Sequence, residues 1–271
     1  MQSFSVLLSL YFKENTDFLR QSLDSIFNQT VRPNEVVLVE DGPLTPELDA
    51  VVKEYAAAHK ELKVISLEKN GGLGRALNVG LKHCSHDLVA RMDTDDIASP
   101  DRFEKQLEAF RRFPQVEVVS ALIDEFSGEK NNITSTRKLP EYPYEIYKYA
   151  KKRCPVNHPV VMFRKNSILL AGGYRHFPLF EDYYLWIRLL LNGGKFYNVQ
   201  ESLLYFRTSP DMYKRRGGFR HALTEVRFQN HIRKLGFIGW PRMCMNVTIR
   251  FTTRIMPNGL RRLIYNKLLR K

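Results

Sequence analysis

The chain has 271 residues, of which 44% are hydrophobic, and it carries a formal net charge of +13. This length can bury a large core, and the composition is that of a globular protein rather than a disordered or fibrous one. No uninterrupted apolar stretch approaches the ~18 residues that a membrane span requires, and Met1 is followed by neither a basic segment nor a small-residue cleavage site. We therefore expect a cytoplasmic protein without a transmembrane segment or signal peptide.

The first part of the chain alternates apolar, strand-like runs with amphipathic helical patterns. Strands are predicted at residues 5–10, 35–40, 63–67, 88–92 and 116–121. Helices are predicted at residues 18–29, 46–59, 73–83 and 100–113, the last with Ser99 as its N-cap and Pro100 as its first residue. This alternation indicates an α/β fold in which βαβ units form a mainly parallel sheet.

The pattern changes after residue 127. A polar loop is predicted at 128–137, followed by a stretch rich in proline and tyrosine, strands at 160–164 and 202–207, and helices at 182–192 and 220–235. Residues 226–271 contain eleven lysines and arginines and no acidic residue. We therefore predict a catalytic domain at 1–215, with a nucleotide-binding half (1–125) and an acceptor-binding half (126–215), and a basic helical extension at 216–271.

Carboxylates follow two of the predicted strands, at the edge where open parallel sheets bind ligands. Glu40 and Asp41 end the second strand and could accept hydrogen bonds from a uracil ring or from ribose, although Asp-Gly-Pro alone is also a common turn. Asp93, Asp95 and Asp96 end the fourth strand, and their mutual repulsion favours a bound cation. Oxygen ligands of this kind select Mg²⁺ or Mn²⁺ and typically bridge it to phosphates. The alternative is that two of these aspartates cap the next helix.

Two further segments carry weaker signals. Arg75 follows a glycine-rich turn that begins at Asn70 and could bind phosphate, but the turn lacks the features of a P-loop. Glu181 and Asp182 lie between apolar residues, which raises a carboxyl pKa and suits a general base. The alternative is that they complement a helix dipole. For His158 a buried structural role is favoured.

Taken together, these segments resemble the family 2 glycosyltransferases, inverting enzymes with the GT-A nucleotide-sugar fold. The resemblance covers residues 3–207 and lies in the order of its motifs rather than in any single one. It is closest to bacterial transferases that build exopolysaccharide, capsule or O-antigen repeat units. The motifs are Phe12-Lys13-Glu14-Asn15 after the first strand, Glu40-Asp41-Gly42, residues 70–78, Asp93-Thr94-Asp95-Asp96, and Glu181-Asp182.

The resemblance implies a UDP-sugar donor, a Mn²⁺ or Mg²⁺ ion and a single displacement. Asp182 would be the catalytic base, Glu181 would help bind the acceptor, and Asp95 and Asp93 would hold the metal. The residues expected to bind the nucleotide-sugar are Leu10, Glu14, Glu40, Asp41, Asn70, Arg75, Asp93 and Thr94. Thr208 and Ser209 stand where many members have a histidine near the metal, so no histidine ligand is predicted.

The basic tail is interleaved with apolar residues and could lie on an anionic membrane, near a glycan or lipid-linked glycan acceptor. We therefore expect a peripheral position on the inner face of the cell membrane, the alternative being an extension packed on the catalytic domain. No nucleic-acid partner is expected because no nucleic-acid-binding module is present. Two alternatives to a glycosyltransferase are a sugar nucleotidyltransferase and a nucleotide-sugar-binding protein without catalysis. The first requires a glycine-rich loop where this chain has Tyr11-Phe12-Lys13-Glu14.

Overall fold

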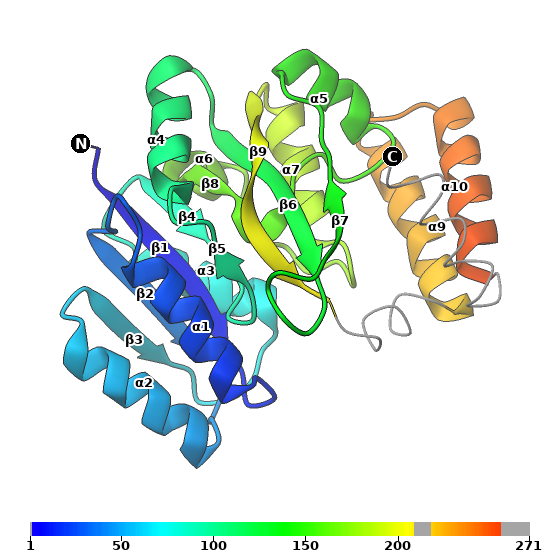
Figure 1. Ribbon diagram of the computed structural model, residues 1–271. Coiled ribbons are helices and arrows are strands. Elements are labelled where there is room, and N and C mark those ends of the chain that lie inside the picture. Colours follow the sequence, from blue (N-terminus) through cyan, green and yellow to red (C-terminus); the bar gives the residue numbers. More distant parts are fainter. Residues whose placement is uncertain (1, 209–217, 256–271) are drawn as a thin grey trace.

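The computed structural model of the protein describes residues 2–208 and 218–255 (Figure 1). The first half is a regular alternation of strands and helices, as the apolar periodicity predicts. In chain order it consists of β1 (Phe4–Leu10), α1 (Thr16–Phe27), β2 (Glu35–Glu40), α2 (Pro46–Ala58), β3 (Leu62–Ser66), α3 (Leu73–His83) and β4 (Leu88–Arg91). Side-chain caps fix two of these helix starts, because Asn15 accepts hydrogen bonds from two amides of α1 and Thr45 accepts one from α2.

The second half is less regular and adds mixed strand pairs. It comprises β5 (Ile97–Ala98), α4 (Arg102–Arg112), β6 (Val118–Phe126), β7 (Ile133–Arg137), α5 (Pro143–Ala150), a 3-10 turn (His158–Val160), β8 (Met162–Arg164), α6 (Lys165–Leu170), α7 (Glu181–Leu191) and β9 (Phe196–Arg207). Two helices follow, α9 (Phe219–Lys234) and α10 (Trp240–Ile255).

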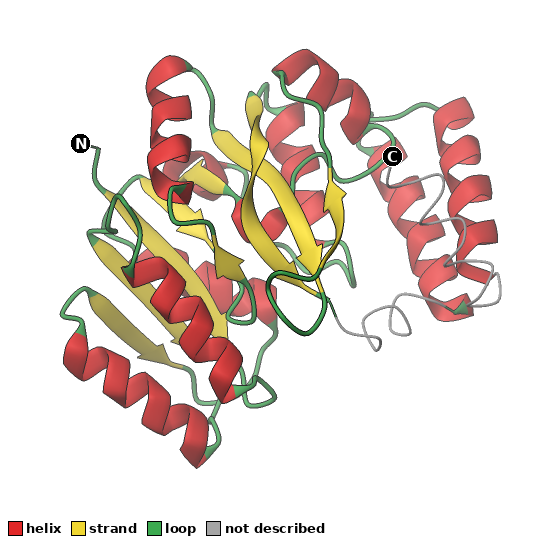
Figure 2. Ribbon diagram, in the orientation of Figure 1, coloured by secondary structure: helices red, strands yellow, loops and turns green. Residues whose placement is uncertain are grey.

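One sheet runs through the described part of the chain in the order β3-β2-β1-β4-β8-β6-β9-β5, with β7 paired to β6. The β1–β2, β2–β3, β1–β4 and β6–β9 pairs are parallel, whereas β8, β5 and β7 pair antiparallel to their neighbours. Helices cover both faces (Figure 2). The apolar faces of α1, α2 and α4 pack on one side of the sheet, and those of α3, α6, α7 and α9 on the other. The predicted α/β class is confirmed.

Three details differ from the sequence prediction. Helix α4 begins at Arg102 rather than Pro100, and Ser99 is not its N-cap, because the Ser99 hydroxyl donates to Asp101 Oδ1 at 2.7 Å instead. The segment predicted as a polar loop contains β7, which was missed because its residues, Ile-Thr-Ser-Thr-Arg, are exposed or half-buried and pair only with β6. Both β6 and β9 extend further than predicted.

The C-terminal helices pack against the preceding part of the chain. Phe228 and Ile232 of α9 belong to the core beside α7. Asn246 of α10 donates from Nδ2 to Lys151 O and to Gln229 Oε1, both at 2.9 Å. None of the helices in residues 2–208 and 218–255 combines the length and apolar character needed to cross a bilayer. Residues 216–217 and 256–271 of the predicted extension lie outside the described residues.

Candidate active site

The carboxyl ends of β1, β2 and β4 meet beside the start of α3 (Figure 1). The β1–β2 register pairs Leu10 with Glu40, and the amide of Asp41 donates to Leu10 O at 2.7 Å. Leu10 is fully buried, and its carbonyl oxygen is already taken by the Asp41 amide. Glu40 is half-buried and accepts a hydrogen bond from the Ser66 hydroxyl at 2.6 Å.

Asp41 joins the turn after β2 to the glycine-rich loop before α3. Its carboxylate accepts hydrogen bonds from the amides of Gly71 at 2.8 Å and Gly72 at 2.9 Å, and only 3% of the residue is exposed. Asn70 closes the link, because its Nδ2 donates to Asp41 O at 3.0 Å. Gly42 adopts φ +88°, and a Cβ there would lie 2.5 Å from Asn70 N. The two segments therefore form one unit, which sequence reasoning had treated separately.

Arg75 and Glu14 make separate contacts in this region. The Arg75 side chain folds back over Gly71, where a Cβ would meet its Cδ at 2.4 Å, and it remains exposed. Glu14 accepts a hydrogen bond from the buried Thr94 hydroxyl at 3.0 Å. This contact ties the loop after β1 to the acidic segment after β4.

The acidic segment brings together the three aspartates that the sequence singled out. One carboxylate oxygen from each of Asp93, Asp95 and Asp96 lies within 4.8 Å of the others. The chain continues into β5, and α4 begins only at Arg102, so these aspartates do not cap that helix. Burial, and then repulsion from Asp93, raises the pKa of Asp95 to about 7. Burial, and then repulsion from Asp95, raises the pKa of Asp96 well above its ordinary value.

This group of oxygens fits a hard divalent cation. Asp96 accepts a hydrogen bond from the Arg207 amide on Oδ1 at 2.9 Å, while its buried Oδ2 has no partner among the described residues. Carboxylates that raise one another's pKa at close range are stabilised in their charged forms when a cation binds between them. Asp93 and Asp95 are partly exposed and could reach such an ion, whereas Asp96 is fully buried.

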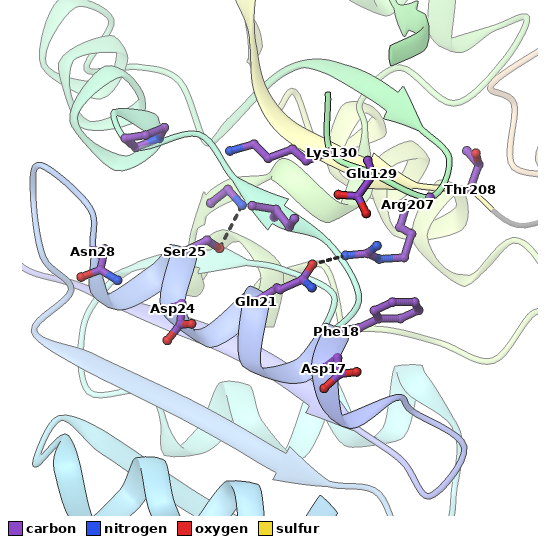
Figure 3. Close-up of a pocket in the computed structure, with 14 residues that line it drawn as sticks. Asp17, Phe18, Gln21, Asp24, Ser25, Asn28, Glu129, Lys130, Arg207 and Thr208 are labelled. Carbon is purple, nitrogen blue, oxygen red and sulfur yellow. Dashed lines mark hydrogen bonds between the residues drawn. The ribbon is translucent and has the colours of Figure 1, made fainter. Parts of the chain in front are cut away.

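Arg207, at the end of β9, was not predicted as a site residue. Its Nε donates to Asp95 O at 2.9 Å, its Nη2 donates to Gln21 Oε1 at 2.7 Å, and its guanidinium stacks 3.8 Å from the ring centroid of Phe18 (Figure 3). These contacts hold the acidic segment against α1 and beside an open hollow of about 790 Å³. The sequence gives no sign of the contact between Arg207 and Asp95 because the two residues lie far apart in the chain.

Asp182 and Glu181 are the first two residues of α7. Burial raises the pKa of Asp182, and the Cys154 thiol faces this carboxylate, with its Sγ 4.0 Å from Asp182 Oδ2. Glu181 pairs with His176 Nδ1 at 3.0 Å, and its Oε2 lies 3.1 Å from where a Cβ on Gly74 would be. The start of α7 therefore abuts the start of α3.

His158 packs against two aromatic residues, Tyr174 and Trp186. Its Nε2 and the Tyr174 hydroxyl are 2.9 Å apart, and its ring packs edge-on against Trp186. Burial lowers the pKa of His158 well below its ordinary value. A neutral, packed imidazole agrees with the structural role favoured from the sequence.

Relatives of similar length include two that carry the names of polysaccharide transferases. The chain is 39% identical over 268 residues to the E. coli UDP-Gal:alpha-D-GlcNAc-diphosphoundecaprenol beta-1,3-galactosyltransferase, with 99% of this chain and 97% of the relative covered. It is also 39% identical over 267 residues to the amylovoran biosynthesis glycosyltransferase AmsE of Erwinia amylovora, with 97% and 98% covered.

Solved structures share the fold at low sequence identity. The crystal structure of residues 1–349 of S. aureus TarS in complex with UDP-GlcNAc superposes with a TM-score of 0.63 at 18% identity, covering 99% of this chain and 72% of that one. The chain spans 53% of a longer TarS structure. The mannosyltransferase PcManGT of Pyrobaculum calidifontis, in complex with GDP-Man and Mn²⁺, gives a TM-score of 0.61 at 16% identity, with 95% and 71% covered. The sequence model of glycosyl transferase family 2 matches residues 5–170, and the chain belongs to that family.

Proposed function

We propose that the protein is an inverting, metal-dependent glycosyltransferase that moves one hexose from a UDP-sugar to a hydroxyl acceptor. The observation that carries the proposal is the contact between the starts of α3 and α7, where Glu181 lies against Gly74. It brings the segment that contains Asp182 to the loop held by Asp41. A candidate base and a candidate donor site thus share one edge of the sheet.

The proposed metal ligands are Asp93 and Asp95, with Mn²⁺ or Mg²⁺ as the ion. When bound, such an ion supplies positive charge against the charge that develops on a leaving diphosphate. The hard oxygen set and the raised pKa of Asp95 support this proposal, as does the presence of Mn²⁺ in the Pyrobaculum relative's complex.

Asp182 is the proposed general base. It removes the proton from the acceptor hydroxyl while the hydroxyl oxygen bonds to the anomeric carbon, and the bond from that carbon to the diphosphate oxygen breaks. One displacement from the opposite face inverts the anomeric centre. The partly buried carboxylate suits this role because its raised pKa brings it nearer to the pH at which it must accept a proton. Glu181 is the proposed acceptor-binding acid.

The donor and acceptor classes follow from the relatives. A UDP-hexose donor, with galactose tested before glucose and N-acetylhexosamines, and a lipid-linked glycan acceptor for bacterial polysaccharide assembly are proposed because the E. coli relative's name specifies UDP-Gal and a diphosphoundecaprenol acceptor. Residues 1–215 form the proposed catalytic domain, with a donor half up to residue 125 and an acceptor half after it.

Turnover by the Asp182→Asn variant and by the wild type tests two claims. The first is that Asp182 is the general base, and the second is that the protein is a catalyst. We expect UDP release from UDP-hexoses in Mn²⁺ to fall about 10² to 10⁴-fold while UDP binding persists. Glu145→Gln, which removes an exposed acid from the first turn of α5, is the matched control and should retain full activity. Normal turnover by the Asp182 variant would refute the assignment, and an absence of turnover in the wild type with every donor and acceptor would favour a binding protein without catalysis.

We also propose that α10 rests on the cytoplasmic face of an anionic membrane. Its exposed apolar residues are Trp240, Met245 and Ile249, with 59%, 51% and 55% exposed, and basic residues flank them. Their joint replacement by serine should abolish co-sedimentation with phosphatidylglycerol vesicles without unfolding the protein, because these side chains are largely outside the core. Leu170→Ser, at a position that is 85% exposed on α6, is the control. Equal sedimentation of both variants would refute membrane contact through these side chains.

A further inference from the structure

Arg91 is the last residue of β4 and stands two residues before Asp93, the first aspartate of the acidic segment. Only 1% of it is exposed, and its guanidinium binds Asp93 through both terminal nitrogens. Nη1 donates to Asp93 Oδ2 at 2.8 Å, and Nη2 donates to Asp93 Oδ1. A planar guanidinium that grips both oxygens fixes the rotation of the carboxylate, which a single hydrogen bond does not.

The backbone of Arg91 is itself held on both sides. Its amide donates to Val161 O at 2.8 Å, and its carbonyl accepts from Nη2 of the fully buried Arg102 at 2.7 Å. Arg102 in turn donates from Nε to Gln106 Oε1 at 3.1 Å. The backbone of Arg91 is therefore held firmly in the sheet. The Asp93 carboxylate is oriented by this strand residue and not only by the loop to which Asp93 belongs.

The charge of Arg91 also acts on both the acidic cluster and the proposed base. Its positive charge favours the charged forms of Asp95 and Asp96, and it opposes part of the rise that burial causes in the pKa of Asp182. A buried cation is costly unless anions surround it, and here the anions are the residues assigned to the reaction. Its burial alone therefore does not account for an arginine at this position.

We propose that Arg91 is a positioning residue, which holds the Asp93 carboxylate so that Asp93 and Asp95 can bind one divalent cation together. This inference rests on the metal site of the proposed function. Because Arg91 occupies one lone pair on each Asp93 oxygen, the remaining lone pairs have a fixed direction. Residues that orient metal ligands in this way typically change metal affinity about 10 to 100-fold when they are replaced.

Arg91→Lys tests the role, because lysine keeps the charge but cannot grip both oxygens. Calorimetry of UDP binding in Mn²⁺ should show a dissociation constant about tenfold larger than in the wild type, with less than a twofold change in EDTA. Arg164→Lys is the control: it alters a half-buried arginine of the adjacent strand β8, which pairs with Leu88 at the start of β4 and donates from Nε to Val116 O at 3.1 Å. It should lower the melting temperature and leave the Mn²⁺-dependent gain in UDP affinity unchanged.

A combination with Asp93→Asn separates positioning from a general loss of structure. If Arg91 acts through Asp93, adding Arg91→Lys to Asp93→Asn should leave the UDP dissociation constant in Mn²⁺ within twofold of that of Asp93→Asn alone. An independent further loss, or a single Arg91 variant that matches the wild type, would overturn the inference. If wild-type UDP affinity is the same in Mn²⁺ and EDTA, the proposed metal site itself is refuted. This result is distinct from the two outcomes that overturn only the role of Arg91.

Discussion

Asp95→Asn should make the metal-free protein more stable at neutral and alkaline pH, although it removes a proposed functional group. Burial and the neighbouring Asp93 disfavour the ionised form of Asp95, which raises its pKa from 3.8 to about 7. The native state therefore binds a proton at Asp95 more tightly than the unfolded state does. Stability from this group is fully present below about pH 4 and is lost as the pH rises through about 7.

The magnitude follows from that shift. A rise from 3.8 to about 7 is about three pKa units, and at about 1.36 kcal/mol per unit the ionised carboxylate costs about 4 kcal/mol of folding free energy above pH 7. Because the segment can relax and water can reach Asp95, we expect urea unfolding to show a cost of about 1–3 kcal/mol. Asparagine removes this cost, and it also relieves the repulsion that Asp95 exerts on Asp96.

Urea unfolding in EDTA, at pH 5 and pH 8, measures the effect. The variant should exceed the wild type by about 1–3 kcal/mol at pH 8 and by less at pH 5, where Asp95 ionises only in the unfolded state. Glu108→Gln removes an equal charge from the exposed surface of α4 and should change stability by less than about 0.5 kcal/mol at either pH. A destabilised Asp95 variant at pH 8, or a gain independent of pH, would refute the reasoning.

Three further changes test other contacts of the site. Gly42→Ala forces a Cβ to 2.5 Å from Asn70 N at φ +88°, so we expect a loss of about 1–3 kcal/mol in urea unfolding and weaker UDP binding in calorimetry. Arg207→Met removes the anchor of the acidic segment and should weaken UDP binding in Mn²⁺ about tenfold, with the affinity in EDTA unchanged. Cys154→Ser offers a stronger hydrogen-bond donor to the ionised form of Asp182, which should lower its pKa and move the acid limb of the pH profile of kcat/KM to lower pH.

The sequence predicts the parts of the molecule that depend on local patterns. Apolar periodicity located the strands and helices of the first half, with α3 predicted to the residue at 73–83. The acidic cluster was recognisable because three carboxylates in four residues at a strand end are unfavourable without a partner. Helix α7, which has Asp182 in its first turn, was also predicted to within one residue at each end.

Contacts between distant segments were not predictable in this way. Nothing near Asp41 in the chain indicates that its carboxylate binds the amides of Gly71 and Gly72, because the contact depends on the β2–β3 register and the position of α3. Arg91 and Arg207 resemble surface arginines in the sequence, since charge alone does not reveal burial or a carboxylate partner. Strand β7 was missed because its exposed, polar residues lack an apolar face.

The two halves of the site are joined through α3 itself. Asn78 accepts from the Tyr174 amide at 2.8 Å and donates to Tyr174 O at 2.7 Å, four residues along the helix from the contact between Gly74 and Glu181. The same helix begins at the loop that Asp41 holds. A displacement reaction requires the attacking and leaving groups to be aligned within a fraction of an ångström. Because α3 contacts the proposed donor loop at its start and the segment before the proposed base along its length, we expect this one helix to fix the separation between the two.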